Sequence, residues 1–428
     1  YPQPLTPDQI AFEAGEVLIE YQVTETKTVI FVVRPDKTVY QFSVPVTRPE
    51  LKELVQAFRK PFENPVDESG RMTGAFDIAA GAKLYDLLLK PALTAQAPKA
   101  SGPLIAAGSR LVIVPDGMLG LIPFEALVTG GVDSSLWKTV INADGIASLS
   151  APPGAGYVGD AYDISYAQSA TAMTLARTLR KAGRAAGGIF VLADPIFSRS
   201  DPRVKGVGLE SYVSREEAEQ VGKSVAQRLM GVGGSRDAQV SFPRLPETGR
   251  LAQKLYADFG KEVVRLVGRD ANEAALRQED LSRYRYLVFA THGLLDSDVP
   301  YIREPALVLN QLGNSREEDG FLTLSKVMSL KLNADVVALT ACKTGLGRQV
   351  SGEGVMGLGR GFQYAGSRNV LVSLWSVAEE STTRLTGTFF KNLRQGRPPR
   401  EALRRARADI RAGGAEEGQP IEEGHLCL

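Results

Sequence analysis

Cys342 and His292 are the two residues whose types and positions could perform covalent chemistry. Each follows a short apolar run of the kind that forms a buried strand: 336–341 precedes Cys342, and 286–290 is followed by Thr291 and His292. Parallel strands present their carboxyl ends at one edge of a sheet, where ligands bind in open α/β folds. The sequence therefore predicts a cysteine and a histidine at the same edge of one sheet.

This pair of side chains suits nucleophilic catalysis. A thiolate attacks a carbonyl far better than a thiol, so a catalytic cysteine needs a base nearby. Imidazole exchanges protons near neutral pH because its ordinary pKa is about 6.5. The other histidine, His425, lies in a Gly- and Glu-rich tail, which leaves His292 as the candidate base. The alternatives are a buried structural cysteine and a satisfied core histidine.

The residues around the pair carry a resemblance to a known family. His292 lies 50 residues before Cys342, close to the separation of about 50 residues in caspases. The matching segments are 289–293, 339–345, 352–354, 362–366 and 374–377, with 114–127 upstream. With these motifs in this order, the sequence resembles the CHAT family of caspase-like cysteine peptidases, relatives of separase. The resemblance runs from about Leu111 to about Ala406.

The resemblance implies a cysteine endopeptidase that hydrolyses peptide bonds in protein substrates through a Cys342–His292 dyad. It also implies an oxyanion hole made by the backbone N–H groups of Cys342 and Gly293. Glycine at 293 would let the backbone approach a substrate closely, although a turn could equally require it.

Substrate selection is also implied by the resemblance. Separase-type relatives bind a basic P1 side chain with an acid that follows a Trp-x-Val element, and Glu379 is the closest match to that position. Glu380, Asp296 and Asp298 are further candidates for this substrate-binding role. A carboxylate at a helix start also complements the helix dipole, which is the structural alternative for Glu379.

The bulk composition limits the possible classes of function. The chain has 428 residues, 43% hydrophobic and 23% charged, with a formal net charge of +1, which is typical of a globular protein of two or three domains. The charge gives no case for a nucleic-acid partner, and no apolar run is long enough for a membrane span. Two cysteines indicate a reducing compartment, and we expect a cytoplasmic protein.

No cofactor is expected from the motifs. The sequence has no P-loop lysine motif and no Cys/His metal cluster. The glycines of 352–357 match G-x-G-x-x-G, but a polar loop precedes them where a dinucleotide site needs a strand. We therefore interpret these glycines as close packing of a helix. A nucleotide-binding α/β protein remains a hypothesis that ranks below both a peptidase and an interaction module.

Alternating strand and helix patterns predict an α/β fold with a mostly parallel sheet flanked by helices. Apolar runs at 17–23, 28–33 and 38–44 predict antiparallel strands at the start of the chain. The predicted parts are an N-terminal β-rich segment (1–72), a first α/β unit (73–245) with an insertion (198–242), a catalytic caspase-like unit (246–412) and a tail (413–428). The resemblance implies that the first unit is a pseudo-protease beside an active protease.

The expected partners follow from the same resemblance. A protein or peptide is the substrate, and a regulatory protein or an upstream helical-repeat domain is expected to control the enzyme. Because the chain begins at Tyr1, we expect a fragment or a processed form. The main alternative function is a non-catalytic protein-interaction module that retains the fold.

Overall fold

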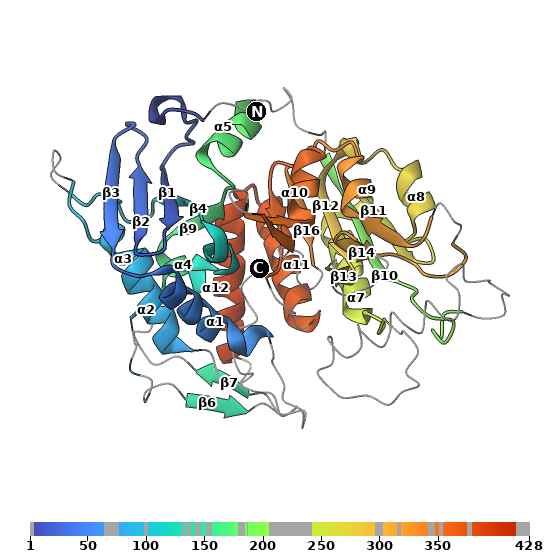
Figure 1. Ribbon diagram of the computed structural model, residues 1–428. Helices are drawn as coiled ribbons and strands as arrows, with labels where there is room; N and C mark the ends of the chain where they lie inside the picture. Colours follow the sequence, from blue (N-terminus) through green and yellow to red (C-terminus); the bar gives the residue numbers. More distant parts are fainter. Residues whose placement is uncertain are drawn as a thin grey trace.

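The computed structural model of the chain shows two α/β units side by side, each built on a five-stranded sheet (Figure 1). The structure describes residues 4–63, 77–97, 102–130, 133, 135, 138–141, 147–150, 156–178, 185, 187–204, 242–295, 303–314, 318–340, 347–350, 354–374 and 379–416. The helix α12 (Pro399–Glu416) lies between the two units.

The first sheet combines antiparallel and parallel strands in the order β3-β2-β1-β4-β9. Its strands are β1 (Glu16–Val23), β2 (Thr28–Val33), β3 (Val39–Val44), β4 (Arg110–Val114) and β9 (Asp163–Tyr166). Short turns make β1, β2 and β3 antiparallel, as predicted, and Lys37 takes a positive φ of 69° in the second turn. Longer connections make β4 parallel to both β1 and β9.

Strand alternation divides the core of the first unit between the two faces of its sheet. Val17, Ile19 and Tyr21 join the larger core, while Leu18 joins the smaller one with Met173. The helices of this unit are α1 (Arg48–Glu63), α2 (Ile78–Leu88), α3 (Lys90–Leu93), α4 (Val158–Ala161) and α5 (Ala170–Thr178). Short strands form two further pairs: β5 (Val128–Gly130) with β8 (Gly156–Tyr157), and β6 (Lys138–Ile141) with β7 (Ala147–Ser150).

The second sheet is parallel throughout, with the order β11-β10-β12-β16-β19. Its strands are β10 (Gly187–Pro195), β11 (Val263–Gly268), β12 (Tyr284–Ala290), β16 (Val336–Leu339) and β19 (Val370–Leu371). The chain goes outward from β10 to β11 and then returns to place β12 on the other side of β10. The carboxyl ends of β10 and β12 therefore form the topological switch point at which open α/β sheets bind ligands.

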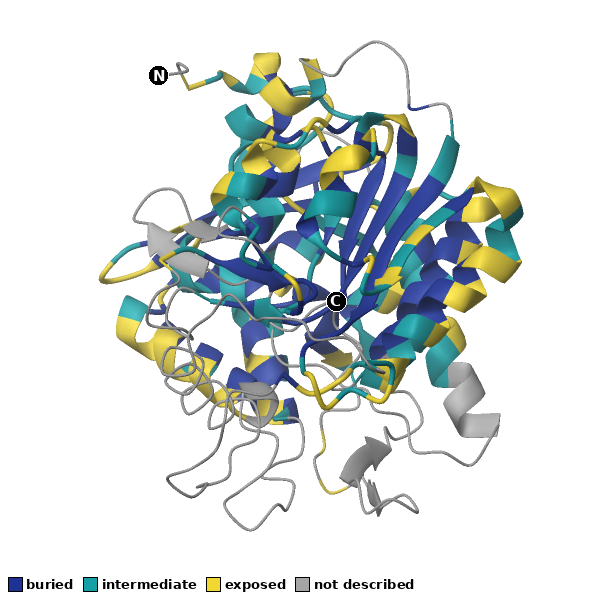
Figure 2. Cartoon of the chain, turned by 90° about the vertical axis from the view of Figure 1, so that its right-hand side faces the viewer, coloured by how far each residue is buried: buried dark blue, intermediate teal, exposed yellow. Residues whose placement is uncertain are grey.

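Helices cover both faces of the second sheet, and its strands are deeply buried (Figure 2). One face packs against α7 (Pro246–Phe259), α11 (Glu379–Arg394) and α12, and the other against α8 (Glu273–Gln278), α9 (Leu324–Met328) and α10 (Leu358–Tyr364). Burial on both faces explains why these strands are uninterrupted apolar runs in the sequence. Two small sheets follow β12 and β16 in the chain. The first contains β13 (Gly293–Leu294), β14 (Ala306–Val308) and β15 (Phe321–Thr323), and the second contains β17 (Gly347–Val350) and β18 (Gly354–Gly357).

A row of arginines on α12 joins the two units. The guanidinium groups point to acids of the first unit and are spaced three or four residues apart, on one face of the helix. The pairs are Arg400 with Glu16 at 2.6 Å, Arg404 with Asp163 at 2.6 Å, Arg407 with Glu125 at 2.6 Å, and Arg411 with Asp160. From the sequence alone, the basic cluster 394–411 is most simply interpreted as a solvated helix face. That interpretation is wrong for these four arginines, because they pair with acids of the first unit.

Two further elements differ from their predictions. The apolar run 189–193 falls within the predicted first unit (73–245), but β10 belongs to the second sheet, where it lies between β11 and β12. The glycines of 352–357 were interpreted as part of a packed helix, but α10 begins only at Leu358 and the preceding Gly354–Gly357 forms the strand β18. Within the predicted insertion (198–242), the helical pattern at 214–229 lies outside the described residues.

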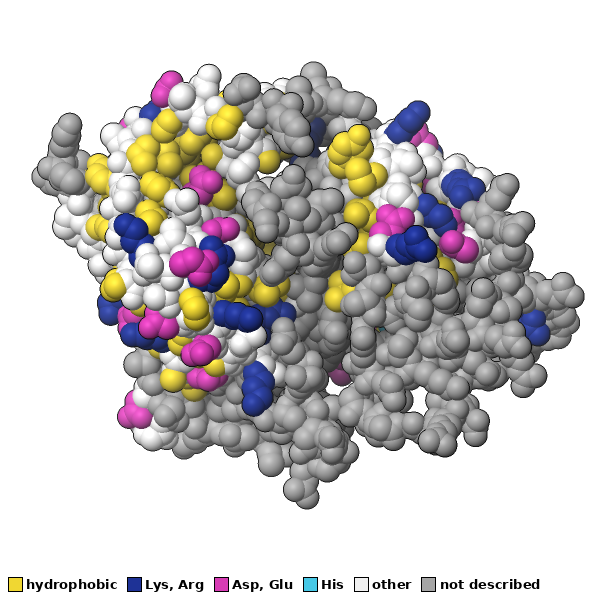
Figure 3. Space-filling model, in the orientation of Figure 1, with side chains coloured by type: hydrophobic (Ala, Val, Ile, Leu, Met, Phe, Trp, Pro, Cys, Tyr) yellow, Lys and Arg dark blue, Asp and Glu magenta, His cyan; other side chains and the backbone are white. Residues whose placement is uncertain are grey.

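The described surface carries both signs of charge. On the face shown in Figure 3, basic and acidic side chains are interspersed over the described residues. Within the parts of the chain that the structure describes, every helix is too short or too polar to cross a membrane. Those same parts hold no cluster of three or more His, Cys, Asp or Glu side chains that could bind a metal ion.

Candidate functional site

The candidate site lies at the carboxyl ends of β12 and β16. These strands pair in parallel, with Phe289 opposite Leu339, and the Thr340 N–H extends the ladder by donating to the Phe289 carbonyl at 3.1 Å. His292 follows Phe289 by three residues. Cys342 likewise follows Leu339 by three residues, although Cys342 itself lies outside the described residues, as do Asp296 and Asp298.

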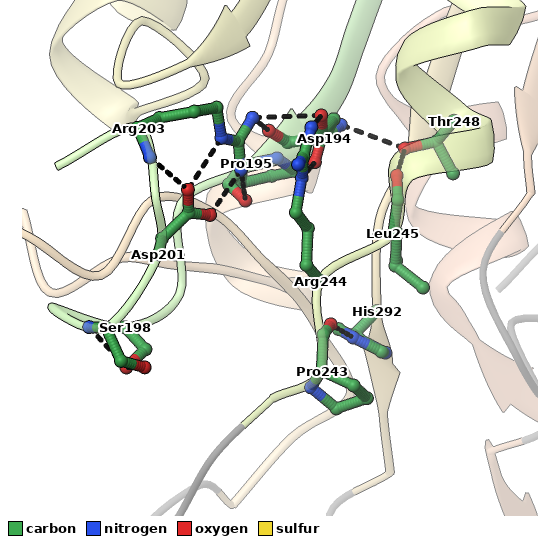
Figure 4. A network of polar contacts seen from close by, with 11 residues as sticks. Asp194, Pro195, Ser198, Asp201, Arg203, Pro243, Arg244, Leu245, Thr248 and His292 are labelled. Carbon is green, nitrogen blue, oxygen red and sulfur yellow. Dashed lines mark hydrogen bonds and ion pairs between the residues drawn. The ribbon is translucent and has the colours of Figure 1, made fainter.

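His292 is held by a backbone carbonyl and two aromatic rings. Its Nε2 lies 2.7 Å from the carbonyl oxygen of Pro243 (Figure 4). The ring centroids of Phe197 and Phe242 lie 5.0 and 5.7 Å from that of the imidazole. Only 7% of the residue is exposed. Among the described residues, the imidazole therefore has an apolar environment and a polar contact with the Pro243 carbonyl.

The contact with Pro243 determines which ring nitrogen carries the proton. A carbonyl oxygen only accepts hydrogen bonds, so Nε2 must be the donor. In neutral His292 the lone pair then lies on Nδ1. The structure thus assigns Nδ1 as the nitrogen that can take a proton from another group.

The environment of His292 predicts an unusual titration. Burial lowers its pKa from the ordinary value of 6.5, and the hydrogen bond to Pro243 offsets only part of this effect. We expect the His292 Cε1 signal in NMR spectra to titrate below pH 6.5. The unfolded chain then binds a proton more readily, so the free energy of unfolding should fall as the pH falls from 6.5 through the lowered pKa.

A matched variant separates this contribution from the other titrating groups. In His292→Gln the pH dependence of unfolding over that window should be weaker, while His425→Ala should leave it unchanged. A His292 midpoint at or above 6.5 would contradict the prediction.

Gly293 is positioned by a strand rather than by a turn. It is the first residue of β13 and pairs with Leu307 of β14. Directly before it, the Val308 N–H donates to the His292 carbonyl at 2.9 Å, and the Thr291 hydroxyl donates to the Val308 carbonyl. Gly293 is not among the glycines with a positive φ. The backbone around it is therefore held by a regular ladder.

A network of ion pairs lies beside His292, at the end of β10 (Figure 4). Its centre is Asp194, which is 5% exposed and has a positive φ of 44°. Arg244 donates to both carboxylate oxygens of Asp194, at 3.2 and 2.9 Å. Arg203 contacts the same carboxylate at 2.9 Å and binds Asp201 at 2.6 Å. The Asp194 carboxylate is thus paired with two guanidinium groups.

Glu379 contacts the start of another helix. Its Oε1 accepts hydrogen bonds from the backbone N–H groups of Glu247 and Thr248, at 2.5 and 3.2 Å, in the first turn of α7. Burial raises the pKa of Glu379, and these two hydrogen bonds lower it only in part. Glu380 is exposed in the first turn of α11. The acid predicted to bind substrate therefore also caps a neighbouring helix.

Sequence reasoning missed Asp194, Arg244 and the Pro243 carbonyl. A signal for Asp194 was present, because a charged residue directly follows a long apolar strand. No side-chain pattern marks a backbone carbonyl, so the role of Pro243 had no signal.

The chain was compared with solved structures, with curated proteins and with sequence models of protein families. Two solved structures of the Saccharomyces cerevisiae separase–securin complex are similar to this chain, with TM-scores of 0.48 and 0.47 and 10% sequence identity. The matches cover 94% of this chain and 29% of the other chain, so this chain spans less than a third of that length. No curated protein matches in sequence. A sequence model of the CHAT domain matches residues 79–421. Because that match covers most of the chain, the protein belongs to the CHAT domain family.

Proposed function

We propose that the protein is a cysteine endopeptidase that hydrolyses peptide bonds through a Cys342–His292 dyad. The single observation that carries the proposal is the register of β12 and β16. Both candidate residues follow the pair Phe289–Leu339 at the same distance along the chain. Cys342 and His292 each follow a residue of this parallel pair by three positions. Two residues at equal distances beyond paired positions are expected to lie close together at the carboxyl edge of the sheet.

The tautomer of His292 supports the same reaction. Nε2 donates to Pro243, so Nδ1 is the base that takes the thiol proton of Cys342. The thiolate attacks the scissile carbonyl carbon, and the carbonyl electron pair moves to oxygen. The backbone N–H groups of Cys342 and Gly293 stabilise this oxyanion.

The remaining steps return the enzyme to its starting state. The intermediate expels the amine, which receives the proton from His292, and an acyl-enzyme thioester remains. His292 then takes a proton from water, the hydroxide attacks the thioester, and the thiolate leaves and is reprotonated. Each proton that His292 accepts is donated again in the same cycle.

We propose further that the enzyme cleaves after a basic P1 residue. Glu379 is the described acid that best matches the expected position, and Glu380, Asp296 and Asp298 are the other candidates. The two backbone amides of α7 contact Oε1 of Glu379, and a carboxylate also has a second oxygen that can accept from a guanidinium. Asp194 is a poorer candidate because two arginines already occupy its carboxylate.

We also propose that a regulatory protein or an upstream domain controls the activity in the cytoplasm. The control is needed because an intracellular peptidase without it would damage other proteins. The low cysteine content, two in 428 residues, supports a reducing compartment.

The test of the function is covalent labelling with an acyloxymethyl ketone that carries a P1 arginine. We expect it to label the wild type at Cys342 and to leave Cys342→Ala and His292→Ala unlabelled. A matched probe with a P1 aspartate should react at least about tenfold more slowly, as an ion pair in the S1 pocket requires. Equal labelling by the two probes would disprove the basic P1 preference but leave the dyad intact.

The alternative is a non-catalytic interaction module, and the burial of His292 between two phenylalanines favours it. It predicts that neither probe nor a general thiol reagent reaches Cys342 faster than a free thiol. It also predicts that wild type and Cys342→Ala bind protein partners equally. Selective labelling of Cys342 would exclude it.

A further inference from the structure

The backbone that contacts His292 is itself held by the ion pairs at the end of β10. Pro243 accepts from the imidazole, and the next residue, Arg244, binds the carboxylate of Asp194 (Figure 4). Phe242, the residue before Pro243, contacts the imidazole ring. Three consecutive residues therefore contact either the candidate base or the acid at the end of the neighbouring strand.

We propose that Asp194 and Arg244 are positioning residues for His292, and that their ion pair keeps the Pro243 carbonyl on Nε2. The inference rests on the proposed function, in which Nδ1 must be free to accept the thiol proton. Neither residue touches substrate or the reacting atoms in this proposal. They act through the backbone at Pro243.

The geometry around Asp194 shows how its carboxylate is held in place. Its backbone N–H donates to the Thr248 hydroxyl at 2.9 Å, and that hydroxyl donates to the Leu245 carbonyl at 2.7 Å. A Cβ at position 249 would lie 3.0 Å from Oδ2 of Asp194, so Gly249 permits this close approach to α7. The carboxylate therefore lies against the first turn of α7, and the 242–245 segment is linked to Asp194 through the Arg244 side chain and, by way of the Thr248 hydroxyl, through the Leu245 carbonyl.

The backbone of Asp194 is also strained. A non-glycine residue with a φ of 44° lies in the left-handed region, which is unfavourable unless the surroundings impose it. Such outliers concentrate at sites that must hold a fixed geometry. Here the strain places a carboxylate at the switch point between β10 and β12, within reach of Arg244.

Loss of the ion pair would change the chemistry of the imidazole. Without the Pro243 acceptor, the buried Nε2–H would lack a partner, which is unfavourable. The neutral ring would then also populate the tautomer with the proton on Nδ1. That tautomer has no lone pair facing the thiol and cannot act as its base.

The groups around His292 differ in character from side to side. The charged groups of the adjoining network are Asp194, Asp201, Arg203, Arg244 and Glu379. The apolar cluster on the other side contains Phe197, Phe242, Leu294, Ala306, Val308 and Phe321. Removal of Arg244 could therefore change the pKa of His292 in two ways, through loss of the Pro243 contact or through loss of a nearby charge. Only loss of the Pro243 contact is expected to change the tautomer, so the tautomer distinguishes the two causes.

The experiment compares Arg244→Ala, Arg244→Lys and Asp194→Asn with wild type. The control is Arg368→Ala, which removes an aspartate-paired guanidinium away from His292; Arg368 is more buried than Arg244 and pairs with Asp335 at 2.6 Å near the start of β16. The first readout is the ¹⁵N chemical shifts of His292, assigned with the help of His425→Ala, because these report the tautomer directly. The second readout is kcat and KM for peptide hydrolysis.

We expect wild type and Arg368→Ala to hold the proton on Nε2. Arg244→Ala and Asp194→Asn should show a mixture of tautomers, and kcat should fall by about tenfold or more because base catalysis is impaired. KM should change by less than about twofold, since ground-state binding is untouched. Arg244→Lys keeps a positive charge that can pair with Asp194, so its tautomer mixture and its kcat should lie between those of Arg244→Ala and wild type.

The tautomer measurement decides the inference separately from the proposed function. If Arg244→Ala folds and its His292 keeps the proton entirely on Nε2, the positioning role is wrong. If Arg244→Ala does not fold, Arg244→Lys and Asp194→Asn supply the same comparison. If the tautomer changes as expected but wild type hydrolyses no peptide, the positioning role stands and the proposed peptidase activity fails.

Discussion

Replacement of Glu16 by glutamine is expected to lower the free energy of unfolding by about 3–5 kcal/mol, the usual cost of breaking a buried ion pair from one side. Glu16 is fully buried. Arg177 donates to both of its carboxylate oxygens, at 2.6 and 2.9 Å, and Arg400 of α12 donates at 2.6 Å. A neutral amide would remove the counter-charge of the partly buried Arg177 and would leave Arg400 paired with the more exposed Glu13.

The pH dependence gives a second sign of the same interaction. Burial acts to raise the pKa of Glu16, but the hydrogen bonds from Arg177 and the Glu13 N–H, with the charge of Arg400, lower it below 4.5. The stabilisation is therefore complete above pH 4.5 and is lost as the pH falls through the lowered pKa. Wild type should lose more stability in this acidic range than Glu16→Gln.

Urea unfolding at neutral pH, followed by circular dichroism, measures the first effect. The matched control is Glu401→Gln, which breaks pairs with Arg397 and Arg405 on the more exposed surface of α12. Such pairs contribute about 0.2–1 kcal/mol. Equal losses in the two variants would show that Glu16 is not a strong link between the units.

Replacement of His292 by alanine should lower kcat for peptide hydrolysis by about 100- to 10,000-fold, the range attributed to a positioned general base. His292 accepts the thiol proton and later donates it to the leaving amine, so both transfers would be lost. The Pro243 carbonyl would also lose the Nε2 donor. The acidic limb of the pH–rate profile should disappear, since it reports protonation of Nδ1.

Turnover of an arginyl peptide over a range of pH tests this prediction. His425→Ala serves as the control, because it removes the only other histidine of the sequence, and it should retain wild-type kcat. A His292→Ala variant that keeps more than about a tenth of the wild-type rate would exclude His292 as the base.

The strands of the second sheet were predictable from the sequence because they are buried on both faces. The runs 286–290 and 336–341 have no polar interruption, which indicates a strand and says little about its neighbours. Because an apolar run does not indicate which strands lie beside it, the position of β10 in the second sheet was not predictable. An apolar strand fits equally well beside β4 or between β11 and β12, and only tertiary packing decides between them.

The arginines of α12 illustrate the same limit for charged residues. Their helical spacing was visible in the sequence, but a solvated face and an interface have the same local pattern. The difference lies in Glu16, Glu125, Asp160 and Asp163, which come from distant parts of the chain.

The sequence could propose side chains for the candidate site but not its backbone contacts. His292 and Gly293 were proposed because few residue types can do acid–base chemistry or allow close approach of the backbone. The Pro243 carbonyl lies 49 residues before His292, and any residue could have supplied it. The capping of α7 by Glu379 also depends on how α7 and α11 pack together.

The pairing of Arg400 with Glu16 has a consequence for how the protein is made. The two residues are 384 apart in the chain. At 5–20 residues per second, the ribosome adds α12 roughly 20–80 s after β1. Until then the Glu16 carboxylate lacks one of its two guanidinium partners, and the first unit cannot complete its native contacts. Nascent chains should therefore depend on chaperones during this interval, and the first unit should reach its final stability only when the second unit has folded.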